Sequence, residues 1–567
     1  MHSVKTDFPG LAALERHVRQ AAIPLPSPHP PYVLFFAACD GLRRAKVKIA
    51  RGSDFASAWQ EGINWLQDMH QNARVPTKWL RVDWPTEVEE VTWNRLHRLL
   101  ARTKRNYFRL GLALDEKFDR AFTEQELNAN AMLYGGNKFD NATLNEGNFA
   151  LYVKTRFPHN SKVVFTAAEK LFMFFGEGAM LDQGMVFPLY PTGRNAGRRV
   201  VPSLNQDILF QLIGNGASFL ARQVGSDGRF VYGYHPCFDR TIDTYNTLRH
   251  ASSTYAMVEA CELVDDRHLR LSIERAIRLL VSDFIVDGTL PNGDRAAFLK
   301  EDNGDIKLGG NALALLALCK YATVFQTDRH RALMDKLAMG IEFMQDPETG
   351  HFKHVYSYPE LELREEHRTI YYEGEAAFAL MRFFELSQND RWLKIVEKAF
   401  DHFITDGCDQ YHDHWLAYSV DELTKYLPRE EYFRFALDNV SGYLNFVETR
   451  ITTFPTLLEL MMATQRVLRR LDAIPNLTHL VDGIDRKHFA RALQARSRYL
   501  LNGHFWPEYA MFMRSPDKIV GSFFIRHHAF RVRIDDVEHY LSGLIALYTD
   551  CLVNGKLRPF RPCSSTA

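Results

Sequence analysis

The chain has 567 residues, of which 46% are hydrophobic and 24% are charged, a composition typical of a folded globular protein with more than one domain. Its 69 Lys and Arg residues balance its 69 Asp and Glu residues, so no net charge attracts nucleic acid or an anionic membrane surface. No uninterrupted run of about 18 apolar residues predicts a membrane-spanning helix. We therefore expect neither a nucleic-acid partner nor a membrane span.

The first residues and the cysteines favour a reducing compartment. The stretch "MHSVKTDFPGLAALERHVRQ" lacks an apolar core followed by a small-residue cleavage site, so it does not predict a secretory signal. The seven cysteines are scattered and form no CxxC pair, which argues against a structural zinc or redox motif. Cys261 and Cys319 sit in apolar helical runs, as small buried residues do. We expect a cytoplasmic protein.

Residues 1–145 predict a small α/β domain of unknown role. "YVLFFAACDG" and "RRAKVKIARG" predict two strands joined through the Asp40-Gly41 turn. "SDFASAWQEGINWLQDM" has a Ser/Asp cap and the apolar spacing of a helix. "KWLRVDW" and "YFRLGLALD" predict further strands with a helix between them. No GxGxxG or GxxxxGK[ST] motif indicates a phosphate-binding loop.

Residues 146–204 predict a β-rich connecting segment. The stretches "FALYVKTRF", "KVVFTAAEKLFMFF", "GMVFPLYPTG" and "RRVVPS" are expected to form short strands and turns.

From residue 205 to 567 the pattern is helical and repetitive. Helices that are apolar on every face alternate with amphipathic helices, as "NALALLALCKYA" and "RHLRLSIERAIRLL" illustrate. Five pairs can be followed, and a helix near 206–222 and another near 537–553 would form a sixth. An apolar inner ring inside an amphipathic outer ring predicts a mainly α fold, an (α/α)6 toroid of helical hairpins. An open solenoid is the alternative, but the unpaired helices at the two ends favour closure. The five pairs are 248–263 with 267–284, 308–325 with 328–345, 372–387 with 390–405, 412–426 with 428–446 and 452–470 with 485–502.

Polar residues gather where the inner helices begin. When the apolar bodies are aligned, these residues fall at one level of the ring. Helix N-termini carry partial positive charge and free N–H groups, so the ring's mouth should favour an anionic or polyhydroxylated ligand. The residues at this level are His250, Asn311, Glu373 and Asp413, with Arg249, Tyr372, Glu375, His414 and Trp415 beside them, and with Arg450, Asp535, Asp536 and His539 from the later helices.

The hairpin period and three segments carry a family resemblance. "YNTLRHASSTYA", "YYEGEAAFALMRFFELSQNDRWL" and "HDHWLAYSVDEL" resemble the six-hairpin toroid enzymes that act on sugars. That group includes D-glucuronyl C5-epimerases, N-acylglucosamine 2-epimerases, unsaturated glucuronyl hydrolases and several polysaccharide lyases. The resemblance covers about residues 205–553 and leaves residues 1–145 unassigned. It implies a saccharide ligand. We expect no cofactor and assign no residue to a metal site, and whether a metal is required and whether the protein oligomerises stay open.

Roles for the candidate residues follow from acid/base chemistry beside a carboxylate, which needs a base, an acid and a cation. We assign these roles to His250, to Tyr372 or Glu373, and to Arg249. Asp413 and His414 are further catalytic candidates, although a helix cap is the simpler reading of Asp413. Similarly, a lone histidine such as His250 is more often structural than catalytic. The expected substrate-binding residues are Tyr245, Asn246, Arg249, Asn311, Glu375, Trp415, Arg450 and Arg526.

Three functions remain open from the sequence. The first is an epimerase or lyase acting on a glycan that contains uronic acid or amino sugar. The second is a glycoside hydrolase that uses two of the carboxylates of Glu373, Glu375, Asp413 and Asp243. The third is a glycan-binding or regulatory protein of polysaccharide biosynthesis that keeps the funnel without chemistry.

Overall fold

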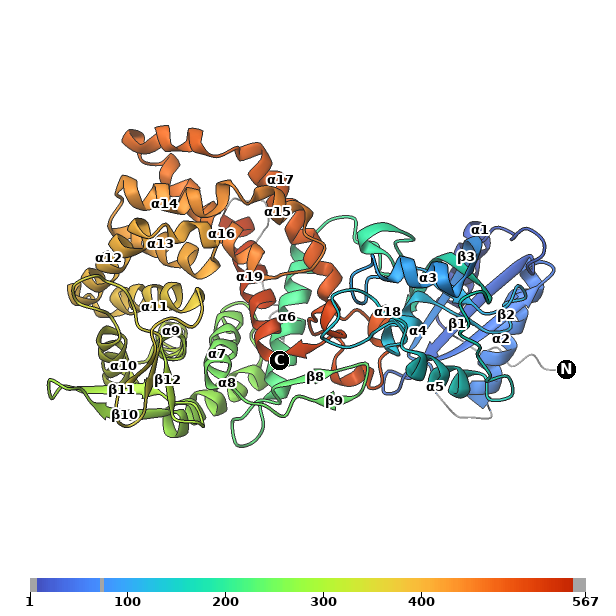
Figure 1. The fold of residues 1–567 in the computed structure, drawn as a ribbon, viewed down its shortest axis with the longest axis horizontal. Coiled ribbons are helices and arrows are strands. Elements are labelled where there is room, and N and C mark those ends of the chain that lie inside the picture. The colour runs from blue at the N-terminus through green and yellow to red at the C-terminus, as the bar shows by residue number, and fades with distance from the viewer. Residues whose placement is uncertain (1–7, 72–75, 554–567) are drawn as a thin grey trace, which may run out of the picture.

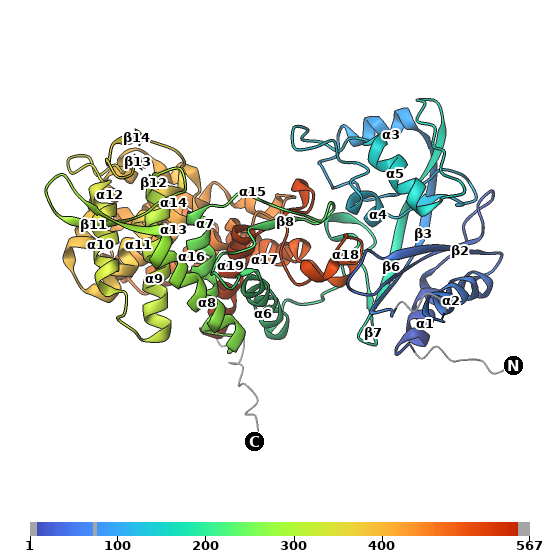
Figure 2. The same ribbon diagram turned by 90° about the horizontal axis from the view of Figure 1, so that it is seen from below.

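The computed structural model describes residues 8–71 and 76–553, with side chains described up to residue 550. The outermost residues of the predicted first and last domains, with Cys551 and Cys563, therefore lie outside the described side chains. An N-terminal part built on a β-sheet lies at one end of the molecule, and a ring of helices lies at the other (Figures 1 and 2).

The N-terminal part contains an antiparallel sheet. Leu34, Phe36 and Ala38 of β1 pack under α1 and α2, while Phe35 and Ala37 point to the opposite face and join the core that continues into the helical part. The strand order is β2-β1-β3-β6-β4-β5, with β7 beside β6. The elements are α1 (Leu11–Ala21), β1 (Tyr32–Cys39), β2 (Lys46–Gly52), α2 (Phe55–Gln71), β3 (Trp79–Thr92), α3 (Trp93–Leu100), β4 (Gly111–Ala113), β5 (Ala121–Phe122), α4 (Glu124–Ala129), α5 (Glu146–Arg156), β6 (Lys170–Asp182) and β7 (Met185–Pro188).

Two features of residues 146–204 differ from the expectation. The stretch "FALYVKTRF" belongs to helix α5, because Asn145 caps the helix through the N–H of Asn148 and Phe149, Tyr152 and Val153 bury one helical face. Strand β6 lies between β3 and β4, in the same sheet as the strands before residue 145. The division of the chain at residues 145 and 204 stays a prediction.

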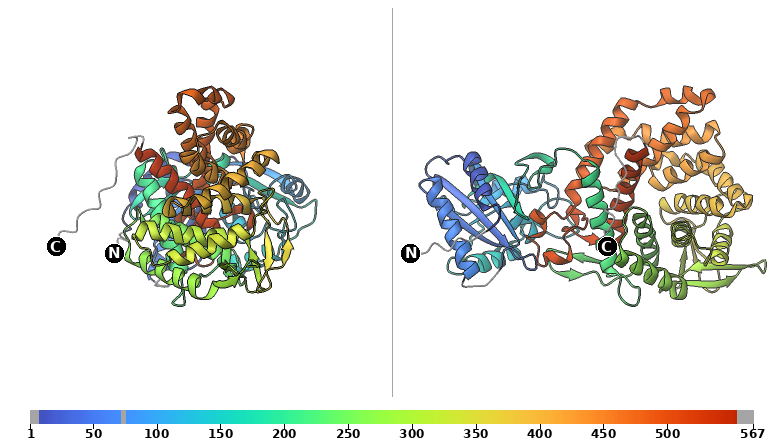
Figure 3. Two further views of the ribbon diagram at one scale, coloured as in Figure 1. Left: turned by 90° about the vertical axis from the view of Figure 1, so that its left-hand side faces the viewer. Right: turned by 180° about the vertical axis from the view of Figure 1, so that it is seen from behind.

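The helical part is a closed double ring, which confirms the predicted (α/α)6 toroid. Each inner helix contacts the next along the chain, and the last returns to the first. In the view from behind in Figure 3, the final helix stands in dark red beside the green helices that open the ring. The inner helices are α7 (Thr247–Cys261), α9 (Leu308–Phe325), α11 (Tyr371–Ser387), α13 (His414–Tyr426), α16 (Thr456–Asp472) and α19 (Ile534–Val553), and the outer helices are α6 (Gln206–Gln223), α8 (Arg267–Leu279), α10 (Arg331–Phe343), α12 (Asp390–Thr405), α14 (Glu430–Ser441) and α17 (Arg486–Tyr499).

Helix α9 is the one described helix that is long and apolar enough to cross a membrane by composition. Its apolar window is 72% buried inside the protein, between α7 and α11. The inner ring therefore accounts for its apolar faces.

Short elements extend the loops of the ring. They lie in the segments that connect an outer helix to the next inner helix along the chain. They are β8 (Gly233–His235), β9 (Arg240–Thr241) and β15 (Val532–Arg533) in one sheet, β10 (Ile285–Thr289) with β11 (Arg295–Leu299), β12 (Asp305–Lys307) with β13 (Val355–Ser357) and β14 (Leu363–Glu365), and the helices α15 (Leu444–Thr449) and α18 (Pro507–Ala510).

Buried and half-buried arginines join the two parts. Arg199 forms a two-pronged contact with Glu508, with Nη2 donating to Oε2 over 2.8 Å and Nε donating to Oε1 over 3.1 Å. Arg81 donates to the carbonyl of Glu508 over 3.0 Å, and Arg44 to the carbonyl of Phe512 over 2.9 Å. These contacts and the shared core hold the N-terminal part against the helical part.

Replacing Glu508 with glutamine should destabilise the protein by about 3–5 kcal/mol, because the buried guanidinium of Arg199 loses its main partner. Urea unfolding of the full chain measures the change. The matched control is Asp239→Asn, which breaks the exposed Lys518–Asp239 pair and should cost less than about 1 kcal/mol. Equal effects of the two substitutions would contradict the assigned role of Glu508.

Candidate active site

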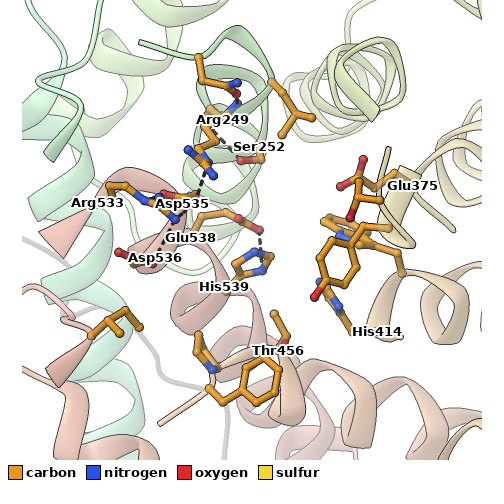
Figure 4. A pocket seen from close by; sticks show the side chains of 18 of the residues that line it. Arg249, Ser252, Glu375, His414, Thr456, Arg533, Asp535, Asp536, Glu538 and His539 are labelled. Atoms are coloured by element: carbon orange, nitrogen blue, oxygen red, sulfur yellow. Dashed lines mark hydrogen bonds and ion pairs between the residues drawn. The ribbon is translucent and has the colours of Figure 1, made fainter. Parts of the chain in front are cut away.

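A cavity of about 560 Å³ opens where the six inner helices begin (Figure 4). Every inner helix contributes side chains from its first two turns, and the loops before α16 and α19 complete the wall. The predicted funnel is therefore present. Its lining includes Asn246 at the N-cap of α7, Arg249 and Ser252 of α7, Leu313 of α9, Tyr371, Tyr372 and Glu375 of α11, His414 and Trp415 of α13, Thr456 of α16, Asp535, Asp536, Glu538 and His539 of α19, Arg533 of β15, and the residues Arg450, His527, His528 and Arg531 between the helices.

Glu375 enters the cavity as a buried acid. Gly374 allows α11 to approach α13, since a Cβ there would lie 2.6 Å from the backbone nitrogen of Leu416. Gly309 of α9 leaves the space that the Glu375 carboxyl group fills. Burial, with the nearby charge of Asp413, raises the pKa of Glu375 to about 8. At neutral pH this carboxyl group is therefore largely protonated and can donate a hydrogen bond.

His539 is a buried cation. Its Nδ1 lies 2.9 Å from Oε2 of Glu459 and 3.6 Å from Oε1 of Glu538. Burial disfavours the charged ring, but the two glutamates outweigh it and raise the pKa of His539 to about 10. In Figure 4 the ring stands in the cavity between Glu538 and His414. His539 is therefore a protonated imidazole at neutral pH, able to donate a hydrogen bond or a proton.

His414 offers the complementary group. Its Nδ1 lies 3.1 Å from Oδ1 of Asp413, which favours the proton on Nδ1 and leaves the lone pair on Nε2. That Nε2 atom is buried and has no hydrogen-bond partner among the described residues. The rings of His414 and His539 meet edge to face with centroids 5.2 Å apart. A free imidazole nitrogen thus lies beside an imidazolium.

Asp413 has a structural role as well. Its carboxylate accepts hydrogen bonds from the backbone N–H groups of Trp415 and Leu416, at 3.2 Å and 3.1 Å, and so caps α13. The cap explains why this aspartate is buried, and it fixes the orientation in which the carboxylate meets His414.

Arginines neutralise the acids of α19. Asp535 lies 2.8 Å from Nε of Arg249 and 2.6 Å from Nη2 of Arg533, and Asp536 lies 3.0 Å from Nη2 of Arg531. Burial opposes its charge, yet these arginines hold the pKa of Asp535 below its usual value. Arg249 lines the cavity as expected, but the carboxylate that it holds belongs to the chain's own Asp535.

Arg450 differs from the other cavity arginines. Its Nε donates to Oγ1 of Thr452 over 2.9 Å, and its guanidinium stacks on Phe446 with 4.9 Å to the ring centroid. In the part of the chain that the structure describes, it makes no ion pair with a carboxylate. Its outer nitrogens are therefore available to an acidic group of a ligand.

Nitrogen and oxygen atoms of His414, Glu459 and His539 lie within 4.8 Å of one another, a separation compatible with a metal ion. A metal ligand must be a neutral imidazole, whereas the pKa of His539 near 10 keeps its ring protonated. The cluster is better suited to hold a proton than a metal.

Three predicted site residues lie outside the cavity. His250 is fully buried, with Nδ1 2.8 Å from the hydroxyl of Tyr245 and Nε2 3.0 Å from the carbonyl of Ala276 on α8. Burial lowers the pKa of His250 to about 4, so the ring is neutral and its two nitrogens are satisfied. The side chain of Asn311 also has its partners within the protein. Its Oδ1 accepts a hydrogen bond from the N–H of Leu299, and its Nδ2 donates to the carbonyl of Lys307. The prediction that His250, Tyr245 and Asn311 face the funnel is wrong.

Two further predicted residues are misplaced. Glu373 lies on the side of α11 away from the cavity, beside His351 and His354. Arg526 is buried against the N-terminal part, 3.6 Å from Glu124. The neighbours of Arg526, His527 and His528, line the cavity in its place.

Seven of the predicted catalytic and substrate-binding residues line the cavity, namely Asn246, Arg249, Tyr372, Glu375, His414, Trp415 and Arg450. Asp535, Asp536 and His539, which the sequence placed at the same level of the ring without a role, line it as well. The catalytic prediction omitted His539, Glu538 and Glu459. One signal was visible: Asp535 and His539 are four residues apart in "IDDVEH", which places them on one helical face.

Comparisons with known proteins give a likeness at the level of the fold. No protein-family model matches the sequence, and the search of curated proteins finds no match. The solved structures that resemble the chain include a cellobiose 2-epimerase from Bacillus thermoamylovorans, with a TM-score of 0.46 and 9% identity over 61% of this chain and 100% of that one. A D-mannose isomerase has a TM-score of 0.46 and 10% identity over 61% and 97%. An unsaturated glucuronyl hydrolase specific for heparin has a TM-score of 0.44 and 9% identity over 63% and 100%.

The contacts between the six inner helices of this chain show by themselves that the ring is closed.

The charge of His539 predicts how the toroid's stability depends on pH. Because the folded-state pKa is raised from 6.5 to about 10, the stabilisation is complete below about pH 6.5 and is lost as the pH rises towards 10. His539→Gln cannot titrate, so the stability difference between wild type and this variant should shrink between pH 6.5 and 10. Urea unfolding across this range measures it, with the exposed His479→Gln as control. A difference that stays constant with pH would show that His539 is not held in its charged form.

Proposed function

We propose that the protein is a carbohydrate-active enzyme that moves protons on a saccharide bound in the cavity, as epimerases and isomerases do. The single observation that supports this most is the pairing of the unpartnered Nε2 of His414 with the imidazolium of His539. An acid and a base side by side suit the transfer of a proton between two positions of one substrate.

The reaction begins with proton abstraction from a carbon beside a carbonyl group. Nε2 of His414 accepts the proton, and the electron pair of the C–H bond moves to the carbonyl oxygen. His539 or the protonated Glu375 donates a hydrogen bond to the developing enolate oxygen. Return of a proton to the other face of the same carbon gives an epimer. Return of a proton to the former carbonyl carbon gives an isomer, provided that the hydroxyl proton on the neighbouring carbon moves to the former carbonyl oxygen.

The remaining lining suits a sugar. Tyr371, Tyr372 and Trp415 present aromatic surface to the cavity, and such rings pack against the apolar faces of pyranoses. The N-termini of the inner helices add N–H groups that favour hydroxyl and acidic groups. Arg450, with its free outer nitrogens, supports a substrate that contains a uronic acid.

A glycoside hydrolase is the second candidate. The protonated Glu375 has the character of a general acid, which such enzymes need. Its partner would be a free carboxylate, whereas Asp535 and Asp536 are bound by arginines. This engagement favours the proton-transfer reaction over hydrolysis. A third candidate, a binding protein without chemistry, is distinguished by the same experiment.

His414→Asn should lower turnover by about 10²–10⁴-fold, because asparagine cannot accept the proton. The protein is incubated in D₂O with a panel of reducing sugars and uronic acids, and NMR records deuterium at the carbon beside the carbonyl. The matched control is His479→Gln, which alters an exposed histidine and should retain full exchange. New reducing ends without deuterium would indicate the hydrolase, and ligand binding with neither product would indicate a binding protein.

Arg450→Gln should weaken the binding of acidic sugars by about tenfold or more and leave neutral sugars unaffected, since a charge-assisted hydrogen bond contributes about 1.5–3 kcal/mol. Calorimetric titration with paired acidic and neutral sugars measures the difference. Arg450→Lys should recover only part of the affinity, because lysine lacks the planar fork of donors. An equal loss for both kinds of sugar would refute recognition of an acidic group by Arg450.

A further inference from the structure

A second group of histidines lies outside the cavity, on the far side of α11. Glu373 is in the first turn of α11, two residues before Glu375, so the two carboxyl groups leave the helix in roughly opposite directions. His351 lies on the segment between α10 and β13, and His402 lies in the last turn of α12. Three separate segments of the chain therefore meet at this point.

The three side chains have the separation of metal ligands. Nε2 of His351 lies 3.6 Å from Oε1 of Glu373, and one ligand atom from each of His351, Glu373 and His402 lies within 4.8 Å of the others. Two ligands of a tetrahedral ion with bonds of about 2.0–2.1 Å are about 3.4 Å apart. Small side-chain rotations would bring the three atoms to that distance.

None of these three side chains makes a hydrogen bond within the described residues. The contacts of Glu373 with His351 and His354, at 3.6 Å and 4.0 Å, are too long, although the residue is only 6% exposed. The nearest partner of His402 is Asp406, with 3.7 Å between Nδ1 and Oδ1. A buried carboxyl group such as that of Glu373 normally has a hydrogen-bond partner, so its convergence with two unpaired imidazoles calls for an explanation such as a bound ion.

His354 belongs to the surroundings of this group and is not a fourth ligand. Its Nδ1 accepts a hydrogen bond from the backbone N–H of Arg368 over 2.9 Å, so the proton of the neutral ring lies on Nε2. That Nε2 atom is buried without a partner and lies 4.0 Å from Oε1 of Glu373. It can therefore donate towards the carboxylate but cannot bind a metal.

We propose that His351, Glu373 and His402 bind a zinc ion. Two imidazoles and one carboxylate form a donor set that zinc accepts in tetrahedral geometry, whereas calcium and magnesium prefer oxygen ligands. The side chain of His351 is 29% exposed, so water can reach the fourth position. Asp406, beside Nδ1 of His402, is placed to orient that ring.

The ion would act as a structural link. It ties the segment before β13 and the end of α12 to the first turn of α11. That same turn carries Tyr371, Tyr372 and Glu375 into the cavity. Zinc would thus stabilise the wall of the cavity from behind without contacting a ligand in it.

The test uses the full chain, first stripped with a chelator and then dialysed against zinc. We expect about one zinc per chain by elemental analysis and a rise in the melting temperature on zinc addition. His351→Gln and His402→Gln should each abolish both effects while retaining the helical circular dichroism of the wild type. Cobalt in place of zinc should give the intense visible bands of a tetrahedral site, and these bands should be lost in the same variants.

Two controls separate this site from the cavity. His367→Gln changes a neighbouring histidine that is not a ligand, and His414→Asn changes the histidine cluster in the cavity. Both variants should keep the zinc. The proposal is overturned if the wild type retains no zinc at micromolar concentration, if His351→Gln and His402→Gln still bind it, or if the zinc is lost in His414→Asn instead.

Discussion

The convergence of six helix N-termini at one end of the ring governs the chemistry of this protein. Each inner helix brings unpaired backbone N–H groups and the positive end of its dipole to the same cavity. Acidic side chains are stabilised there, and Asp413, Asp535 and Asp536 occupy such positions. Arginines and a charged histidine lie opposite these acids. The buried charges of the cavity are therefore paired, and the free-energy penalty of burying an unpaired charge is avoided.

The sequence predicted the ring because its signal is repeated and long. Six inner helices with apolar faces all round, each followed or preceded by an amphipathic partner, leave few other arrangements, and the structure has each predicted pair. Strands β1 and β2 were visible for the same reason, as apolar segments around an Asp-Gly turn. The stretch "FALYVKTRF" is short, so its apolar residues fit a strand or a helix equally well, and only the cap at Asn145 and the packing of Phe149 decide.

The site was harder to predict than the ring, because a helix turns by about 100° with each residue. Arg249 and His250 are adjacent, yet Arg249 faces the cavity and His250 faces α8. The same rotation separates Glu375 from Glu373. A helix start that is read from sequence is uncertain by a few residues, and that uncertainty is enough to exchange the inner and outer faces. Arg526 illustrates another limit of prediction from sequence, namely contacts between distant segments. Its partner Glu124 is about 400 residues away in the chain, and no local sequence pattern indicates the contact.

The protein contains two groups that each consist of two histidines and one glutamate, one in the cavity and one behind α11. Their surroundings determine whether the imidazoles are charged or neutral. In the cavity, Glu459 accepts a hydrogen bond from His539 over 2.9 Å and Glu538 lies 3.6 Å away, and the raised pKa of this imidazole means that it keeps its proton. Behind α11, Glu373 faces its histidines at distances too long for a hydrogen bond, and burial lowers the pKa of His351. A neutral imidazole with a free lone pair is what a metal requires, whereas a charged one is what an acid catalyst requires. The division between a proton site and the proposed zinc site thus follows from a shorter contact between imidazole and carboxylate, 2.9 Å against 3.6 Å.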